Sequence, residues 1–235
     1  MKPSLYLLIP ALFLVSCDQQ EVDASRLVIR NETSYEINSN TPFTGVLLTY
    51  HENGLVDERV TFKDGKQDGL EEVYFMDGQL RSAANYKNGK LDGFSEGYNE
   101  DGTPRYKQDY KDGRLDGLME VYLTFSPYVY RKSDYKDGKH DGISQWYSPE
   151  NGRLTMQEYY KDDLLHGASE AYRDDGTTYS ILNYKNGKLD GISEGFHPNR
   201  SARIYLEDGD VYARSNFKDG ELLGRCFEPG CTDFN

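Results

Sequence analysis

The sequence is poor in the residues and motifs on which most enzymes depend. Its 235 residues include only three cysteines, four histidines and one tryptophan. It contains no Gly-x-Ser-x-Gly nucleophile motif, no His-Glu-x-x-His zinc motif and no glycine-rich phosphate-binding loop. The histidines also lack the paired spacing of metal ligands. We therefore expect a protein that is not an enzyme and that has no catalytic residue, no metal and no cofactor.

Positive charge is also scarce. The chain has 27 Lys and Arg residues against 40 Asp and Glu residues, which gives a formal net charge of −13. A surface this acidic repels the phosphate backbone of nucleic acids and the headgroups of anionic lipids. Nucleic-acid binding and docking on anionic membranes through a basic patch are therefore both disfavoured.

What the sequence does contain is a repeated phrase. The residues from Tyr86 to Gly93, Tyr-Lys-Asn-Gly-Lys-Leu-Asp-Gly, return along most of the chain at spacings of 24, 24, 25, 25, 24 and 33 residues. The copies begin at Phe62, Tyr86, Tyr110, Tyr135, Tyr160, Tyr184 and Phe217. A fixed period of this length is typical of repeat proteins, in which each unit buries its surface against its neighbours.

Each unit contains two turn signals. Asn88-Gly89 is a dipeptide that favours a type I′ turn, because both residues tolerate positive φ. A second signal, such as Asp77-Gly78, lies about twelve residues away in each unit. Two turns per period leave two strands, so the unit is a β-hairpin. Eight units, counted from a degenerate copy at Pro42-Phe43-Thr44-Gly45, predict an all-β, elongated antiparallel sheet on the order of 70 Å long.

Three columns of equivalent residues share one face of this predicted sheet, because they lie two residues apart in each strand. They are an apolar, a glutamate and a tyrosine column, represented by Phe94, Glu96 and Tyr98. The opposite face carries smaller, mixed side chains such as Ser95 and Gly97. We expect the face of Glu96 and Tyr98 to be the packed, curved side and the face of Ser95 to be the more solvated one.

The glutamate column has two interpretations. Recurring carboxylates on an aromatic face could bind cations or a basic partner. Alternatively, each Glu accepts hydrogen bonds from backbone N–H groups or from a Tyr hydroxyl of the neighbouring unit. We expect the structural role, because a uniform column offers no asymmetry that would separate a catalytic acid from a base.

The whole unit, Tyr-Lys-Asp/Asn-Gly-Lys-x-Asp-Gly-x-x-Glu-x-Tyr-x-x-Asp-Gly, resembles the MORN repeat in the bacterial variant that lacks the tryptophan of the eukaryotic consensus. The resemblance implies a single-layer antiparallel β-sheet of serial hairpins, here over residues 42–235, and it brings no catalytic residues. Bacterial proteins with an N-terminal lipobox and a Pro-Phe-Thr-Gly first copy are similar to this chain, and many are described as antitoxin-like. The chain departs from the pattern in an insertion of about nine residues, His197 to Tyr205.

The N-terminus is similar to the signal sequence of bacterial lipoproteins. Met1-Lys2 precedes an apolar stretch from Leu5 to Leu14 that is too short to span a bilayer. Leu14-Val15-Ser16-Cys17 then resembles a lipobox, in which the cysteine is acylated and becomes the new N-terminus. We therefore expect a signal peptide over residues 1–16, lipid attachment at Cys17, and a membrane-anchored protein on the periplasmic or surface side of the cell envelope.

Two further segments precede the repeats. Residues 17–24 are polar and without periodicity, which predicts a tether. Residues 25–41 are interpreted as an N-terminal cap that covers the end strand, with one strand at Leu27 to Arg30 and a turn at Asn31 to Ser34.

Two cysteines remain near the C-terminus once Cys17 is assigned to lipid. Cys226 and Cys231 flank a Pro-Gly turn signal, and an exported chain meets an oxidising compartment. We expect them to form a disulfide that holds the C-terminal cap.

Three functions are compatible with an elongated, tyrosine-rich sheet in the cell envelope. The preferred one is a non-catalytic scaffold, monomeric itself, that binds a protein partner. The alternatives are an antitoxin or immunity-type protein that neutralises a basic partner, and a module that binds cell-envelope glycan. A repeat scaffold acquires specificity where its units differ, so the irregular positions are the expected partner contacts. These are Trp146, Pro127, Tyr128, His197 and Tyr205.

Lipid attachment is testable by membrane partitioning. Replacing Cys17→Ser removes the acylated side chain, so we expect the variant to leave the detergent and membrane fractions that hold the wild-type protein, or to accumulate unprocessed. Phase separation in a cloud-point detergent measures this directly. Equal partitioning of both forms would rule out the anchor.

Overall fold

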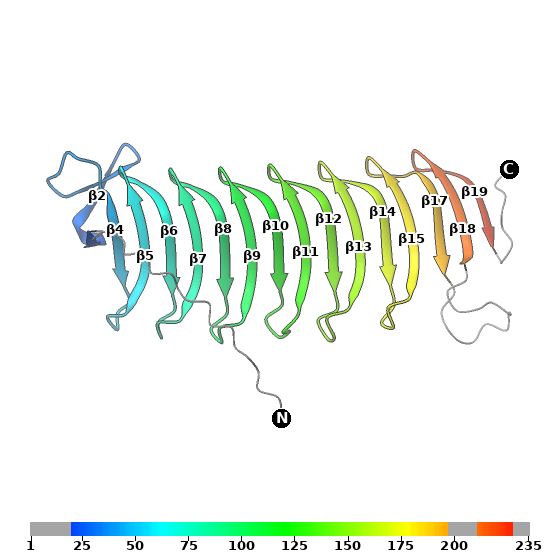
Figure 1. The fold of residues 1–235 in the computed structure, drawn as a ribbon, viewed down its shortest axis with the longest axis horizontal. Helices are drawn as coiled ribbons and strands as arrows, with labels where there is room; N and C mark the ends of the chain where they lie inside the picture. Colours follow the sequence, from blue (N-terminus) through cyan, green and yellow to red (C-terminus); the bar gives the residue numbers. More distant parts are fainter. Residues whose placement is uncertain (1–19, 197–210, 228–235) are drawn as a thin grey trace, which may run out of the picture.

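The computed structural model describes residues 20–196 and 211–227. These residues form one long sheet of 17 strands and a separate two-stranded sheet, and they contain no α-helix. The strands of the long sheet lie side by side along the length of the molecule, so the protein is elongated (Figure 1). The predicted all-β architecture of serial hairpins in a single layer is confirmed.

The strands follow one another in space in nearly the order in which they occur in the chain. From β4 to β16 consecutive strands pair antiparallel, and β15 also pairs with β17, which in turn pairs with β18 and β18 with β19. Their bounds are β4 Gly45–Tyr50, β5 Val56–Lys63, β6 Lys66–Tyr74, β7 Leu80–Lys87, β8 Lys90–Tyr98, β9 Pro104–Lys111, β10 Arg114–Tyr122, β11 Val129–Lys136, β12 Lys139–Tyr147, β13 Leu154–Lys161, β14 Leu164–Tyr172, β15 Thr178–Lys185, β16 Lys188–Leu189, β17 Gly191–Phe196, β18 Val211–Lys218 and β19 Glu221–Phe227.

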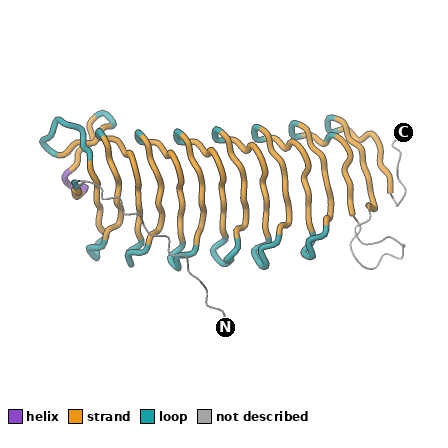
Figure 2. Tube along the Cα trace, viewed as in Figure 1, coloured by secondary structure: helices purple, strands orange, loops and turns teal. Residues whose placement is uncertain are grey.

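Two kinds of connection alternate along the sheet, and each kind occupies one long edge (Figure 2). The turn edge consists of the two-residue turns that follow the odd-numbered strands up to β15 and β18, such as Asn88-Gly89. Asn88 and Gly89 have φ of 50° and 79°, as a type I′ turn requires. The turn Asp162-Asp163 adopts the same conformation without glycine, with φ of 49° and 68°. The loop edge consists of the longer loops on the opposite side.

Successive units are joined to one another at the turn edge. The N–H of each second turn residue donates to a backbone carbonyl of the preceding unit, as Gly89 does to Gln67 at 2.7 Å. The Asp of the repeated phrase adds a second bond, since Asp68 Oδ2 accepts from the N–H of Asn88 at 3.0 Å. The same bond joins Asp92 to Asp112, Asp116 to Asp137 and Asp190 to Asp219. This ladder explains why the phrase requires its Asp.

The second glycine of the phrase allows each strand to bend. Gly117 has a φ of 129°, and a Cβ there would lie 2.8 Å from the Cβ of Asp109 on the neighbouring strand. The pairing register of β9 and β10 shifts at this point, which is a β-bulge. The Asp109 carboxylate accepts the N–H of Leu118 at 3.2 Å, so the bulge leaves no orphaned amide there.

The predicted assignment of the two faces is wrong. Ser95, Ser144, Ser169 and Ser193 are buried, whereas Leu118 and Ile192 of the opposite face are 39% and 45% exposed. Register places the phrase tyrosines on the side of these serines, because Ala84 pairs with Ser95 and Tyr86 pairs with Leu91. In a single layer, large aromatic rings shield the small residues beside them from solvent. A column of aliphatic side chains has no larger neighbours on its face and stays exposed. We call this side the serine face and the other the glutamate face.

The N-terminal end of the sheet has an apolar core and a covered edge. Strand β1 (Glu21–Asp23) pairs parallel with β4, so the second half of the segment predicted as a tether is structured. Val22, Phe43 and Val46 are buried there, each with 3% exposure or less. A short 3-10 helix, η1 (Ala24–Arg26), leads into the hairpin of β2 (Leu27–Arg30) and β3 (Thr33–Glu36), and β2 coincides with the predicted strand.

The turn ladder predicts a specific loss of stability. Replacing Asp68→Ala removes the acceptor of the Asn88 N–H, so we expect the free energy of unfolding to fall by about 0.5–1.5 kcal/mol. Denaturant unfolding followed by circular dichroism measures the change. Asp68→Asn keeps an acceptor oxygen and should lose much less, and an equal loss in both variants would contradict the ladder.

Candidate interaction site

The glutamate face is organised by pairs within a single strand. The hydroxyl of Tyr122 donates to Glu120 at 2.8 Å, and Tyr172 donates to Glu170 in the same way. The tyrosine lies two residues after its acceptor, so the prediction that the hydroxyl comes from the neighbouring unit is wrong. Burial, together with this hydrogen bond, raises the pKa of Tyr98, Tyr122 and Tyr172 to about 12. The hydroxyls therefore remain donors throughout the physiological pH range.

Cations on adjacent strands neutralise much of the glutamate column. Lys132 lies 2.7 Å from Glu120, Arg214 lies 2.6 Å from Glu194, and Arg59 lies 3.4 Å from Glu72. Partial burial opposes ionisation of Glu120, but the hydrogen bonds from Lys132 and Tyr122 prevail and lower its pKa. This arrangement favours the structural interpretation of the column over a cation-binding one.

The serine face is irregular at its centre, around β11 and β12. Trp146 pairs in register with Arg131, and His140 pairs with Tyr135. The His140 ring lies between two tyrosines, with centroids 4.3 Å from Tyr135 and 5.0 Å from Tyr160. Sequence reasoning selected Trp146 and missed both Arg131 and His140. His140 could have been identified by comparing equivalent positions of the repeat, because the other units have leucine there, at residues 91, 115, 165 and 189.

The central cluster contains several buried polar atoms. Ser133 and Ser144 of the same two strands are fully buried and joined by a 3.0 Å hydrogen bond. Arg131 Nε and His140 Nε2 are buried and have no hydrogen-bond partner within the described part of the chain. Burial, and the nearby Arg131 cation, lower the pKa of His140, while Asp163 acts in the opposite direction. The imidazole is therefore held in its neutral form.

The loop edge carries exposed carboxylates and few cationic side chains. Six of its loops lie within the described residues: 51–55, 75–79, 99–103, 123–128, 148–153 and 173–177. Five of the six contain a glycine and at least one exposed carboxylate. These carboxylates are Glu52, Asp77, Glu100, Asp101, Glu150, Asp174 and Asp175. The loop edge is thus an acidic ridge along one side of the sheet.

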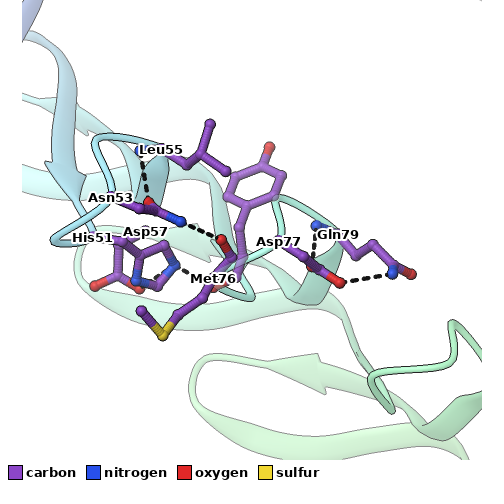
Figure 3. Close-up of polar contacts among 8 residues, drawn as sticks. His51, Asn53, Leu55, Asp57, Met76, Asp77 and Gln79 are labelled. Carbon is purple, nitrogen blue, oxygen red and sulfur yellow. Dashed lines mark hydrogen bonds and ion pairs between the residues drawn. The ribbon is translucent and has the colours of Figure 1, made fainter.

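Hydrogen bonds between neighbouring loops hold the loop edge in place. Asn53 Nδ2 donates to the carbonyl of Met76 at 2.6 Å, while its Oδ1 accepts from the N–H of Leu55 (Figure 3). Asp77 caps its own loop in the same way by accepting the N–H of Gln79 (Figure 3). Further along, Ser126 and Arg153 donate to carbonyls of the next loop, at Pro149 and Asp174.

One loop differs from the other described ones. Residues 123–128 contain neither a charged residue nor a glycine. Phe125 is 100% exposed, and Leu123 and Tyr128 are exposed beside it. The Tyr128 ring packs on Gly152 of the next loop, where a Cβ would lie 2.5 Å from the ring. A large apolar side chain is therefore presented from a rigid base in the middle of an acidic edge.

The predicted contact residues fall in different places. Pro127 and Tyr128 lie in this uncharged loop, while Trp146 is half-buried on the serine face. His197 and Tyr205 lie outside the described residues, although β17 ends and β18 begins at the loop edge. Phe125 was missed, and the signal that could have identified it was the absence of charge from its loop.

The predicted covalent sites stay predictions. Cys17 and Cys231 lie outside the described residues, and Cys226 lies in β19. No set of three or more His, Cys, Asp or Glu side chains within residues 20–196 and 211–227 is arranged to hold a metal ion. In the same residues, no helix has the length and apolar character needed to cross a membrane.

The sequence profile of the MORN repeat variant matches residues 67–88. This segment comprises most of β6, its loop, β7 and the first residue of the following turn, which is one hairpin unit. MORN repeats are commonly scaffolds for interactions with proteins or membranes, and the family is generally non-catalytic. A comparison with curated proteins finds no match to this chain.

The environment of His140 predicts a pH effect on stability. Its pKa in the folded state is lower than the value of about 6.5 in the unfolded chain, so the unfolded state binds more protons as the pH falls below that value. We expect the contribution of neutral His140 to the free energy of unfolding to be fully present above pH 6.5. This contribution should be lost as the pH falls toward the folded-state pKa. His140→Leu introduces the residue found at the equivalent position of other units and removes the titrating group. This variant should show a smaller difference between its unfolding midpoints at pH 7.5 and pH 5.5. An unchanged difference would contradict this.

Proposed function

We propose that this protein is a non-catalytic scaffold, anchored in the cell envelope by lipid on Cys17, that binds a protein partner through its loop edge. The proposal rests on one observation above all, the complete exposure of Phe125. Exposing an aromatic side chain to water is unfavourable, and contiguous exposed apolar residues are commonly interaction sites.

The surroundings of Phe125 support this function. Interface hot spots are typically large aromatic anchors encircled by polar contacts that exclude water. Here Leu123 and Tyr128 accompany the anchor, and the acidic loops on either side supply a polar rim. The hydrogen bonds between loops fix the rim before binding, so little conformational entropy is lost on association.

The acidic ridge favours an antitoxin or immunity-type role as the second candidate. Seven exposed carboxylates along the loop edge are complementary to a basic surface. A scaffold would hold its partner while the partner functions, whereas an immunity protein would inhibit it. An activity assay on the captured partner separates these two functions.

The experiment that tests the proposal is affinity purification of the intact protein from crosslinked envelope. We expect Phe125→Ser to reduce recovery of the partner at least tenfold, because it removes the apolar anchor and leaves the fold unchanged. Ile29→Ser is the matched control, since Ile29 is also highly exposed but lies in the N-terminal hairpin.

Two results would count against this function. Equal losses in Phe125→Ser and Ile29→Ser would mean that exposed apolar residues bind non-specifically. Recovery of peptidoglycan fragments in place of a protein, unaffected by Phe125→Ser, would favour the glycan-binding alternative.

A further inference from the structure

The serine face contains a hollow near its C-terminal end, between β15, β17 and β18. Its volume is about 300 Å³. Small residues form its floor, and its lining includes apolar side chains together with Glu194 and Arg225. The residues that matter here are Ser180, Gly195 and Ala213 on the floor and Leu182, Leu189 and Phe217 on the walls.

The hollow exists because three small residues stand side by side. Ser180 pairs in register with Gly195, and Gly195 pairs with Ala213. At the centre of the sheet the corresponding positions hold Arg131, Trp146 and Met156, which also pair in sequence across three strands. Those three side chains are large, whereas Ser180, Gly195 and Ala213 are all small.

An earlier unit of the same chain shows what fits on such a floor. Ser82 pairs with Gly97, and Gly97 pairs with Tyr106, in the same register as Ser180, Gly195 and Ala213. The Tyr106 ring lies directly on Gly97, where a Cβ would be 2.4 Å from the ring. The three floor positions of the two sites therefore differ only where Tyr106 is replaced by Ala213.

We propose that this hollow is a binding site for an aromatic side chain of a partner polypeptide. A ring from the partner occupies the place that the Tyr106 ring takes in the earlier unit, with its face on Gly195 and its edges against the leucines and Phe217. The volume is at the lower limit of ligand pockets, which begin at about 300 Å³, so it suits one side chain rather than a larger molecule. Aromatic pairs of this kind prefer offset or edge-to-face contact, and Phe217 is placed to provide it.

This site is separate from the loop carrying Phe125. It lies on a face of the sheet and contributes its own apolar contact. The test of this site is therefore independent of the test of the function proposed for the loop edge. Rings also pack on glycine elsewhere in the described residues, where Tyr128 covers Gly152 and Phe43 covers Gly45.

The experiment is a titration of the purified full chain with N-acetyl-tyrosinamide, followed by saturation-transfer NMR. We expect saturable binding to the wild-type protein and binding at least tenfold weaker to Ala213→Tyr, because the new side chain reproduces the Tyr106 arrangement and fills the hollow. Tyr106→Ala should open an equivalent floor at Gly97 and increase the amount of probe bound at saturation. N-acetyl-leucinamide and methyl glucoside should each bind at least tenfold more weakly than the aromatic probe.

Several outcomes would overturn the proposal. They are the absence of saturable binding to the wild-type protein, undiminished binding to Ala213→Tyr, and equal or stronger binding of the aliphatic or sugar probe. Circular dichroism verifies the fold of each variant. If Ala213→Tyr fails to fold, Tyr106→Ala decides alone, and no gain of bound probe in that variant overturns the proposal.

Discussion

The architecture depends on the hydrogen bonds that join one hairpin to the next at the turn edge. A single hairpin of this sequence is too thin to bury an apolar core, and beyond the first unit the buried positions are mostly small residues such as Ser144. The turn N–H groups would face solvent in an isolated hairpin. Stacking gives the N–H of the second turn residue an acceptor in the preceding unit, such as the Gln67 carbonyl, and several first turn residues donate to a carboxylate such as that of Asp68. The period of the sequence therefore keeps successive turns within hydrogen-bonding distance of each other. The last unit has Leu223 in place of the Asp of the phrase, so it lacks the carboxylate acceptor.

Because the turn edge is fixed, variation is confined to the loop edge and to side chains on the two faces. The loops have five residues in four of the described units and six in two. Lengthening a loop here costs little, since it changes no contact between turns. The uncharged loop around Phe125 occurs on this side, where β17 also ends. On the serine face the variation is in side-chain size, and Ala213, at the position of Tyr106 in the earlier unit, lines a hollow.

The hairpins and type I′ turns could be predicted from sequence because each Asx-Gly pair favours positive φ at both residues, whatever its surroundings. The packed face could not be predicted from sequence, because burial in a single layer depends on which small residues the aromatic rings cover. Which residues they cover depends on the strand register, and the bulges at residues such as Gly93 shift that register. Hydrophobicity alone pointed to Phe94 and Leu118, which are exposed. At the site, irregular spacing led to Pro127 and Tyr128. Finding Phe125 required comparing the charge of equivalent loops, and finding His140 required comparing it with the leucines at the equivalent positions of the other units.

The net charge of the chain is distributed unevenly, and this gives the two edges different properties. Eleven exposed lysines flank the turns of the turn edge, where Asp residues lie close to them. On the glutamate face, cations such as Lys132 and Arg214 offset the carboxylates. The described loops carry seven exposed carboxylates but only two arginines, and both arginines donate hydrogen bonds to carbonyls. The negative field of the protein therefore emerges mainly from the loop edge. A positively charged partner would be steered to that edge before any apolar contact forms, so the position of Phe125 within it combines long-range attraction with a short-range anchor.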